Sequence, residues 1–137
     1  MFSDEEGLFA VKKARETIER HLKGKAPVID DAGGAFLKDR GVFVTLNSYP
    51  SHKLRGCIGY PEPVQPLIRS LTDSAISAAS RDSRFPRLRA SELDSIVVEV
   101  SLLTPPEPLK VKKVTEILEA VVVGRDGLIM ERGPFRG

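Results

Sequence analysis

The start of the chain has apolar residues at the spacing of an α-helix. Those residues are Leu8, Val11, Ile18 and Leu22, and the charged residues Lys12, Lys13, Glu16, Glu19 and Arg20 fill the other face. Ser3 and Glu6 have the S-x-x-E spacing of a capping box, in which each side chain caps the other residue's backbone. The pattern therefore predicts a helix from Ser3 to about Lys23, closed by Gly24.

Alternation of apolar and polar residues predicts strands in the middle of the chain. Ala35–Leu37 and Gly41–Leu46 flank the turn KDRG as a hairpin would, and Leu54–Tyr60 follows after a polar loop. In the second of these segments the residues expected on one side are Val42, Val44 and Leu46, and those on the other are Phe43 and Thr45. Ile96–Leu103 alternates in the same way, and the prolines of PPEP end it.

The remaining apolar stretches predict helices and a second hairpin. Val64–Ser80 has a helical apolar stripe, and its second half is rich in Ala and Ser, which indicates close packing against another element. Val114–Ala120 predicts a short helix, and Val121–Val123 with Leu128–Glu131 predicts a hairpin around GRDG. Because short turns join most adjacent strands, we expect an α+β fold with a mixed or largely antiparallel sheet flanked by helices.

Composition indicates an ordinary globular domain. A chain of 137 residues with 41% hydrophobic and 29% charged residues is long enough for one hydrophobic core. A net charge of +2 is too small to indicate nucleic acid, and the six Phe and two Tyr do not interleave with basic residues as in stacking platforms. Signal-peptide and membrane-span patterns are absent, and a single Cys fits a reducing compartment, so we expect a cytoplasmic protein with no membrane partner.

The only cysteine lies in the segment LRGCIG, which combines a thiol, a guanidinium and two glycines. Alternation along a strand would place Leu54, Gly56 and Ile58 toward the core, and Arg55, Cys57 and Gly59 on the opposite face. The cation of Arg55 would then favour the thiolate of Cys57, which is a nucleophile and a soft-metal ligand. Gly56 and Gly59 would leave room for a ligand or for another part of the backbone.

The same segment also fits a purely structural role, in which Cys57 and the glycines pack in the core. A free cysteine often behaves as a small core hydrophobe, and strand glycines often mark bulges or tight packing against a helix, so the spacing alone favours this interpretation. His52 lies close to Cys57 in sequence but falls in a polar loop, where a solvated histidine is the simpler interpretation. Two His and one Cys without zinc-type spacing predict no metal site.

A second candidate site is the segment SRDSRFPRLRAS, which carries four arginines and one aspartate. Guanidinium groups bind carboxylates and phosphates with paired hydrogen bonds, so this segment could form an anion site with Arg55 and Lys53. For Arg87 and Arg89 we favour the alternative, a solvated loop or internal ion pairs. Asp82 would serve as a general base or orient an arginine.

These motifs together resemble the AMMECR domain family. That family is marked by an LRGCIG signature, an A-x-x-A-A helix, a D-x-R-F segment, an E-L pair and a strand of the I-x-V-S-x-L-x-x-P kind. The matching positions here are Leu54–Gly59, Ala75–Ala79, Asp82–Phe85, Glu92–Leu93 and Val98–Pro105, and GRDGLIMERG is similar to a later G-x-x-G-L-x-x-x-x-G segment. The resemblance covers nearly the whole chain, and it makes Arg84 of the D-x-R-F segment the preferred arginine.

The resemblance implies an α+β fold of a larger and a smaller subdomain, with the signature near a cleft between them. It also implies an association with Memo-type proteins and radical S-adenosylmethionine enzymes in a protein-modification pathway, without an assigned reaction or cofactor. Members of the family usually continue beyond RGPFRG. We therefore expect residues 1–137 to be one domain, incomplete at its C-terminus, with exposed apolar residues near 121–131.

These observations predict a domain that binds an anionic ligand or a partner protein in a cleft near Cys57. The residues expected to bind the ligand are Arg55, Gly56, Gly59 and Arg84. The alternative is a cysteine-dependent enzyme in which Cys57 is the nucleophile or covalent acceptor and Asp82 assists it. The sequence yields no complete catalytic constellation, which favours binding over catalysis.

Overall fold

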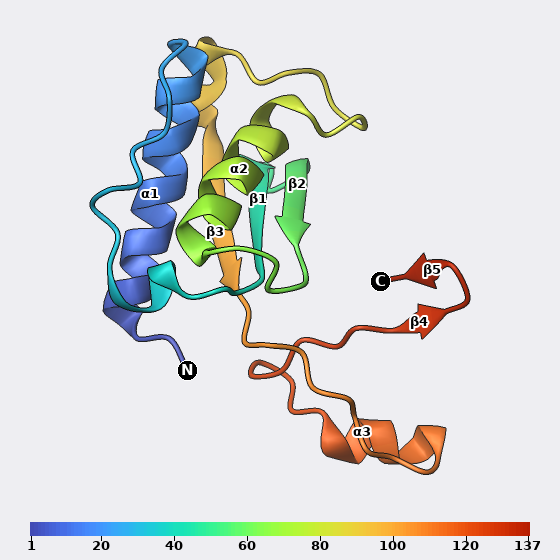
Figure 1. Ribbon diagram of the computed structural model, residues 1–137. Helices are drawn as coiled ribbons and strands as arrows, with labels where there is room; N and C mark the ends of the chain where they lie inside the picture. Colours follow the sequence, from blue (N-terminus) through green and yellow to red (C-terminus); the bar gives the residue numbers. More distant parts are fainter. The chain divides into compact units, whose positions relative to one another are not determined.

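Two units make up the chain in the computed structural model, which describes residues 1–137. The first runs from Met1 to Pro105 and the second from Pro106 to Gly137. Figure 1 shows that the two long helices and the main sheet all belong to the first unit.

The main sheet is antiparallel throughout. Its strands are β1 (Val42–Ser48), β2 (Leu54–Tyr60) and β3 (Ile96–Leu102), in the order β2-β1-β3. The central strand β1 pairs with both neighbours along nearly its full length. The predicted α+β fold with an antiparallel sheet is therefore confirmed.

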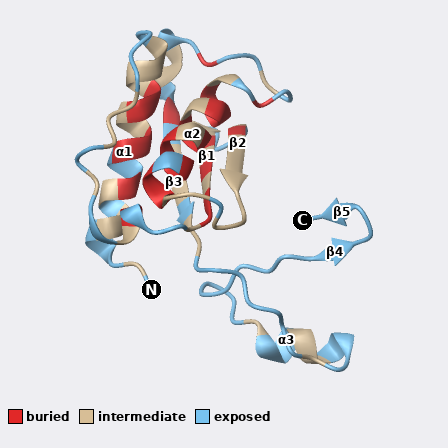
Figure 2. Ribbon diagram, in the orientation of Figure 1, coloured by how far each residue is buried: buried red, intermediate tan, exposed pale blue.

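Two helices pack against one face of this sheet. Helix α1 (Asp4–Leu22) contacts β3, and α2 (Leu67–Ser80) contacts β1 and β2. The core lies between helices and sheet, and Figure 2 shows the buried residues gathered there. The β1 residues toward the helices are fully buried, as their alternation predicts: Val42, Val44 and Leu46. The small residues in the second half of α2 are buried too, which confirms its predicted close packing.

Helix α1 begins as predicted but buries a different face. The backbone N–H of Ser3 donates to Glu6 Oε2 at 2.8 Å, and that of Glu6 donates to Ser3 Oγ at 3.2 Å, which completes the capping box. The expected stripe is wrong in its first half, because Leu8 and Val11 are exposed. The buried residues are instead Ala10, Lys13, Ala14, Thr17 and Ile18. Small alanines four residues apart allow α1 to approach α2 closely.

Lys13 was expected on the solvent side of α1, and its burial corrects that expectation. Only 3% of the residue is exposed, and its ammonium donates to Glu16 and Asp31 at 2.7 Å each. The ring of Phe9 lies 5.7 Å from the same nitrogen. Two carboxylates and an aromatic face thus compensate the loss of water around the charge.

Both predicted hairpins are wrong. Residues 34–37 form a 3₁₀ turn, η1 (Gly34–Leu37), because both edges of β1 are already occupied by β2 and β3. The later hairpin lies further along the chain, where β4 (Glu131–Arg132) pairs with β5 (Phe135–Arg136). Gly133 takes a positive φ of 59° between these strands, a conformation that favours glycine and fixes the turn there.

The second unit has little regular structure and no buried residue. It contains η3 (Val114–Glu116), the four-residue helix α3 (Ile117–Ala120) and the β4–β5 hairpin. The predicted short helix is thus present as η3 and α3. The apolar residues near 121–131 are exposed, as expected: Val122, Val123, Leu128, Ile129 and Met130. No helix of the chain has both the length and the apolar content needed to cross a membrane.

Candidate functional site

The LRGCIG strand contains a β-bulge, one of the two features that its glycines indicate. Leu46 of β1 pairs with Gly56, but the next residue, Asn47, pairs with Leu54, so Arg55 has no partner on β1. One extra residue in a strand reverses the facing of every side chain before it. Leu54 therefore turns away from the core and is 40% exposed, which corrects the expectation that it faces inward.

The same bulge separates Arg55 from Cys57. The guanidinium of Arg55 turns toward the 3₁₀ helix η2 (Ala90–Ser95), where Nε and Nη2 donate to the two carboxylate oxygens of Glu92 at 3.1 and 3.3 Å. The third nitrogen, Nη1, is buried without a hydrogen-bond partner. The expected pairing of this guanidinium with the Cys57 thiol does not occur.

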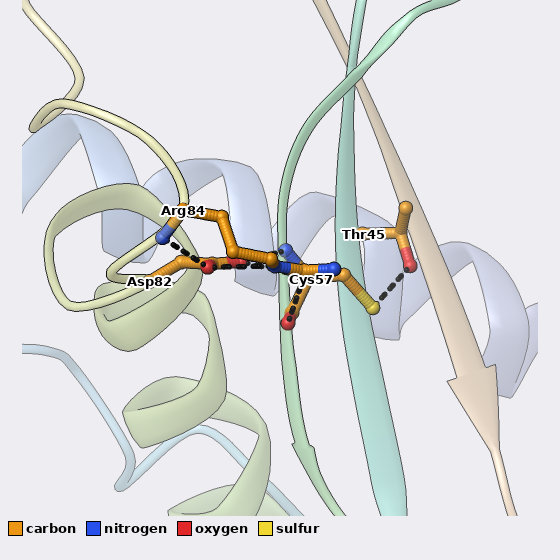
Figure 3. A network of polar contacts seen from close by, with 4 residues as sticks. All are labelled: Thr45, Cys57, Asp82 and Arg84. Carbon is orange, nitrogen blue, oxygen red and sulfur yellow. Dashed lines mark hydrogen bonds and ion pairs between the residues drawn. The ribbon is translucent and has the colours of Figure 1, made fainter. Parts of the chain in front are cut away.

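Cys57 lies on the sheet face opposite Gly56, half-buried. Its Sγ lies 3.2 Å from Oγ1 of Thr45, the residue directly across on β1. Figure 3 shows Thr45 on one side of Cys57, with Asp82 and Arg84 on the other. A catalytic role for this thiol stays a prediction.

Asp82 and Arg84 cover the free edge of β2 beside Cys57. The Cys57 N–H donates to Asp82 Oδ2 at 3.0 Å, and Arg84 Nη2 donates to the Cys57 carbonyl at 3.4 Å. The Arg84 guanidinium also donates to both Asp82 oxygens, at 3.0 and 2.8 Å. The D-x-R segment therefore replaces a neighbouring strand at this edge, since it supplies one acceptor and one donor to the exposed backbone.

This arrangement gives Asp82 the chemistry of an orienting group. Hydrogen bonds from the Arg84 guanidinium, with further ones from the Cys57 and Arg84 backbone, hold the pKa of Asp82 far below its ordinary value. A carboxylate this acidic is a poor general base near neutral pH. Of the two roles foreseen for Asp82, the geometry supports the alignment of an arginine.

The two glycines of the strand face parts of the chain itself. A Cβ at Gly56 would collide with the carbonyl oxygen of Ala78 in α2. A Cβ at Gly59 would collide with the Val42 carbonyl and with the ring of Phe43. The space in front of both positions is filled by helix and sheet, and ligand binding at these glycines stays a prediction.

Arg55 also lines a pocket of about 350 Å³. The residues that line this arginine pocket are Arg55, Pro86, Arg87, Arg89, Ser91 and Glu92. Arg87 and Arg89 are exposed, and neither guanidinium forms an ion pair. Sequence reasoning preferred Arg84, which the structure ties to Asp82, over these two. Leu88 is buried, so the R-x-R spacing around it could have indicated that both arginines point outward.

A family model described as AMMECR1 matches residues 11–137. The chain belongs to the AMMECR1 family. Protein MJ0810 of Methanocaldococcus jannaschii is 56% identical over 133 residues, which are 97% of this chain and 66% of that protein. A relative from Methanothermobacter thermautotrophicus is 53% identical over 137 residues, or 98% of this chain and 70% of the relative. The sequence resemblance is thereby confirmed.

A solved member of the AMMECR1 family has the same fold. The crystal structure of the uncharacterised protein PH0010 from Pyrococcus horikoshii matches with a TM-score of 0.88 at 45% identity, over 99% of this chain and 69% of that one. The chain spans just under two thirds of MJ0810, and slightly more of the other two relatives.

Neither histidine of this AMMECR1-family chain forms a hydrogen bond with Cys57, whose partners are Thr45, Asp82 and Arg84. His52 is exposed in the β1–β2 loop, and its ring meets that of Tyr49 edge-on at 6.1 Å. His21, near the end of α1, has a lowered pKa because it is partly desolvated and lies near the charges of Arg87 and Arg81. Groups of His, Cys, Asp and Glu that could hold a metal ion are absent.

Proposed function

We propose that this AMMECR1-family chain binds an anionic group in the arginine pocket, which starts at Arg55, two residues from Cys57. The observation that carries the proposal is the presence of three arginines, Arg55, Arg87 and Arg89, around one pocket that has a single carboxylate in its lining. Guanidinium groups form charge-assisted hydrogen bonds with carboxylate and phosphate oxygens, so more than one arginine would stabilise an anion in this pocket.

The charge of the pocket supports the same conclusion. Arg55, Arg87 and Arg89 outnumber the one acidic residue, Glu92, which already accepts hydrogen bonds from Arg55 and from the Arg89 backbone. Neither Arg87 nor Arg89 forms a salt bridge with a carboxylate, although the charge of Arg89 helps to lower the pKa of Glu92. Unpaired arginines beside a concave surface are typical of sites that recognise carboxylate or phosphate groups.

Titration calorimetry with sulfate, phosphate and succinate tests the proposal. We expect at least one of these anions to bind, and Arg87→Gln and Arg89→Gln each to weaken that binding by about tenfold, because each removes a charge-assisted hydrogen bond. Arg69→Gln is the matched control, since Arg69 is an exposed arginine of α2 outside the pocket. Equal binding by all four proteins, or no binding of any anion, would contradict the proposal.

The wider role expected from the family stays part of this proposal. We place the chain in a cytoplasmic protein-modification pathway with Memo-type proteins and radical S-adenosylmethionine enzymes. The support for this setting is the family resemblance alone, whereas the support for anion binding is the geometry of the pocket. A result against the pathway assignment would therefore not count against anion binding, and the reverse also holds.

A further inference from the structure

We infer that the anion bound in the arginine pocket is a phosphate monoester in its dianionic form, an inference that rests on the proposed anion site. Three arginines and one glutamate leave the lining of the pocket with two net positive charges. A phosphate monoester carries close to two negative charges at neutral pH, whereas a carboxylate carries one. Charge matching therefore favours the phosphate.

The charge on Glu92 is secure at neutral pH. Burial alone would raise its pKa, but hydrogen bonds from Arg55 and from the Arg89 backbone outweigh this and hold the pKa below its ordinary value. Glu92 also occupies one edge of the Arg55 guanidinium, formed by Nε and Nη2. The Nε/Nη2 edge of Arg55 is thus unavailable for a bidentate contact with a second carboxylate.

The donors that remain suit a tetrahedral group. The donors are the exposed guanidinium groups of Arg87 and Arg89 at different positions of the lining, and Arg55 adds its positive charge. Separate donors fit the three terminal oxygens of a phosphate monoester. A planar carboxylate has two oxygens and gains most from the paired N–H donors of one guanidinium group. It would therefore leave some of the donors in the pocket unused.

The pH dependence of binding distinguishes ionisation of the ligand from ionisation of nearby residues of the protein. The second pKa of a phosphate monoester is about 6, so its dianionic fraction rises about tenfold between pH 5 and pH 7. His21, from α1, lies near the charges of Arg87 and of Arg81, and it gains a charge as the pH falls. That charge would strengthen anion binding at low pH, which is opposite to the change expected from the ligand.

The experiment measures the binding of N-acetyl-O-phosphoserine amide by the full chain at pH 5, 6 and 7, with sulfate as a dianion at every pH. We expect affinity for the phosphoserine derivative, relative to sulfate, to rise about tenfold from pH 5 to pH 7. Arg87→Gln and Arg89→Gln should each weaken it at pH 7 by about tenfold, and Arg69→Gln should not change it. Glucose 6-phosphate in a parallel titration distinguishes a phosphorylated metabolite from a phosphorylated side chain.

Two results would overturn the inference in different ways. If N-acetylglutamate amide bound as tightly as the phosphoserine derivative, or if the affinity ratio to sulfate did not change with pH, the pocket would be an anion site without phosphate preference. The proposed function would then survive. If no anion bound at all, both the inference and the proposed function would be wrong.

Discussion

Because Gly56 has no side chain, α2 can approach β2 closely at this position. Gly56 is buried, and the carbonyl of Ala78 occupies the place where a Cβ would lie. The small residues in the second half of α2 bring the helix backbone this close. The glycine in the middle of the signature thus serves the packing of helix on sheet, one of the two roles that its place in a strand allows.

Gly56→Ala should therefore destabilise the protein by about 3 kcal/mol, because the new methyl group meets backbone that cannot rotate away. Gly7→Ala is the matched control: Gly7 lies inside α1, and nothing is within 4 Å of its Cβ position. There the same change should stabilise the protein by about 0.5–1 kcal/mol. Urea denaturation measures both, and a neutral Gly56→Ala would show that α2 can shift.

The residues around Gly56 show which features of this fold a sequence pattern predicts and which it does not. The alternation of β1 depends on local pattern alone, and its buried face is as predicted. The bulge at Arg55 depends on how β2 pairs with β1, and the glycines of LRGCIG indicate a bulge or tight packing without fixing its position. Leu54 and Arg55 were consequently assigned to the wrong environments, and the pocket at Arg55 could not be foreseen.

At the level of elements, the D-x-R segment holds the edge strand through charged side chains. Asp82 accepts hydrogen bonds from the backbone of Cys57 and Arg84 and from the Arg84 guanidinium. An exposed strand edge is otherwise a place where another chain can pair. Capping boxes such as that of α1 can be read from sequence because both partners are three residues apart, whereas this contact joins residues 25 apart.

Asp82→Asn should cost about 2 kcal/mol at pH 7, because it removes charge-assisted hydrogen bonds to the edge of β2. Since folding lowers the pKa of Asp82, its ionised form contributes stability above the unfolded-state pKa of about 4. That contribution is lost as the pH falls toward the folded-state pKa. The free-energy difference between wild type and Asp82→Asn should thus shrink below about pH 4.

Urea denaturation at pH 7, 5, 4 and 3 measures this difference. Asp94→Asn is a matched control, because Asp94 is exposed on η2 and the change should cost less than about 0.5 kcal/mol at pH 7. A difference for Asp82→Asn that stayed constant down to pH 3 would mean that the carboxylate does not hold the strand through its charge.

At the scale of the whole molecule, the two units differ in what stabilises them. The first buries a core between α1, α2 and the sheet, and its central strand is hydrogen-bonded on both sides. The second buries no residue, and Leu118 and Val123 are 85% and 96% exposed. Hydrophobic burial is the main favourable term in folding, so almost all of the chain's stability should come from the first unit.

Hydrogen exchange followed by mass spectrometry tests this difference. Amides of β1 such as those of Val44 and Leu46 should exchange only when the first unit unfolds globally, whereas amides between 114 and 137 should exchange through local opening, far faster. A mild urea concentration should speed exchange in β1 and leave the second unit nearly unchanged, because local opening exposes little new surface. Protection near Leu118 equal to that of β1 would show that the second unit is covered in solution, since its own residues bury no core.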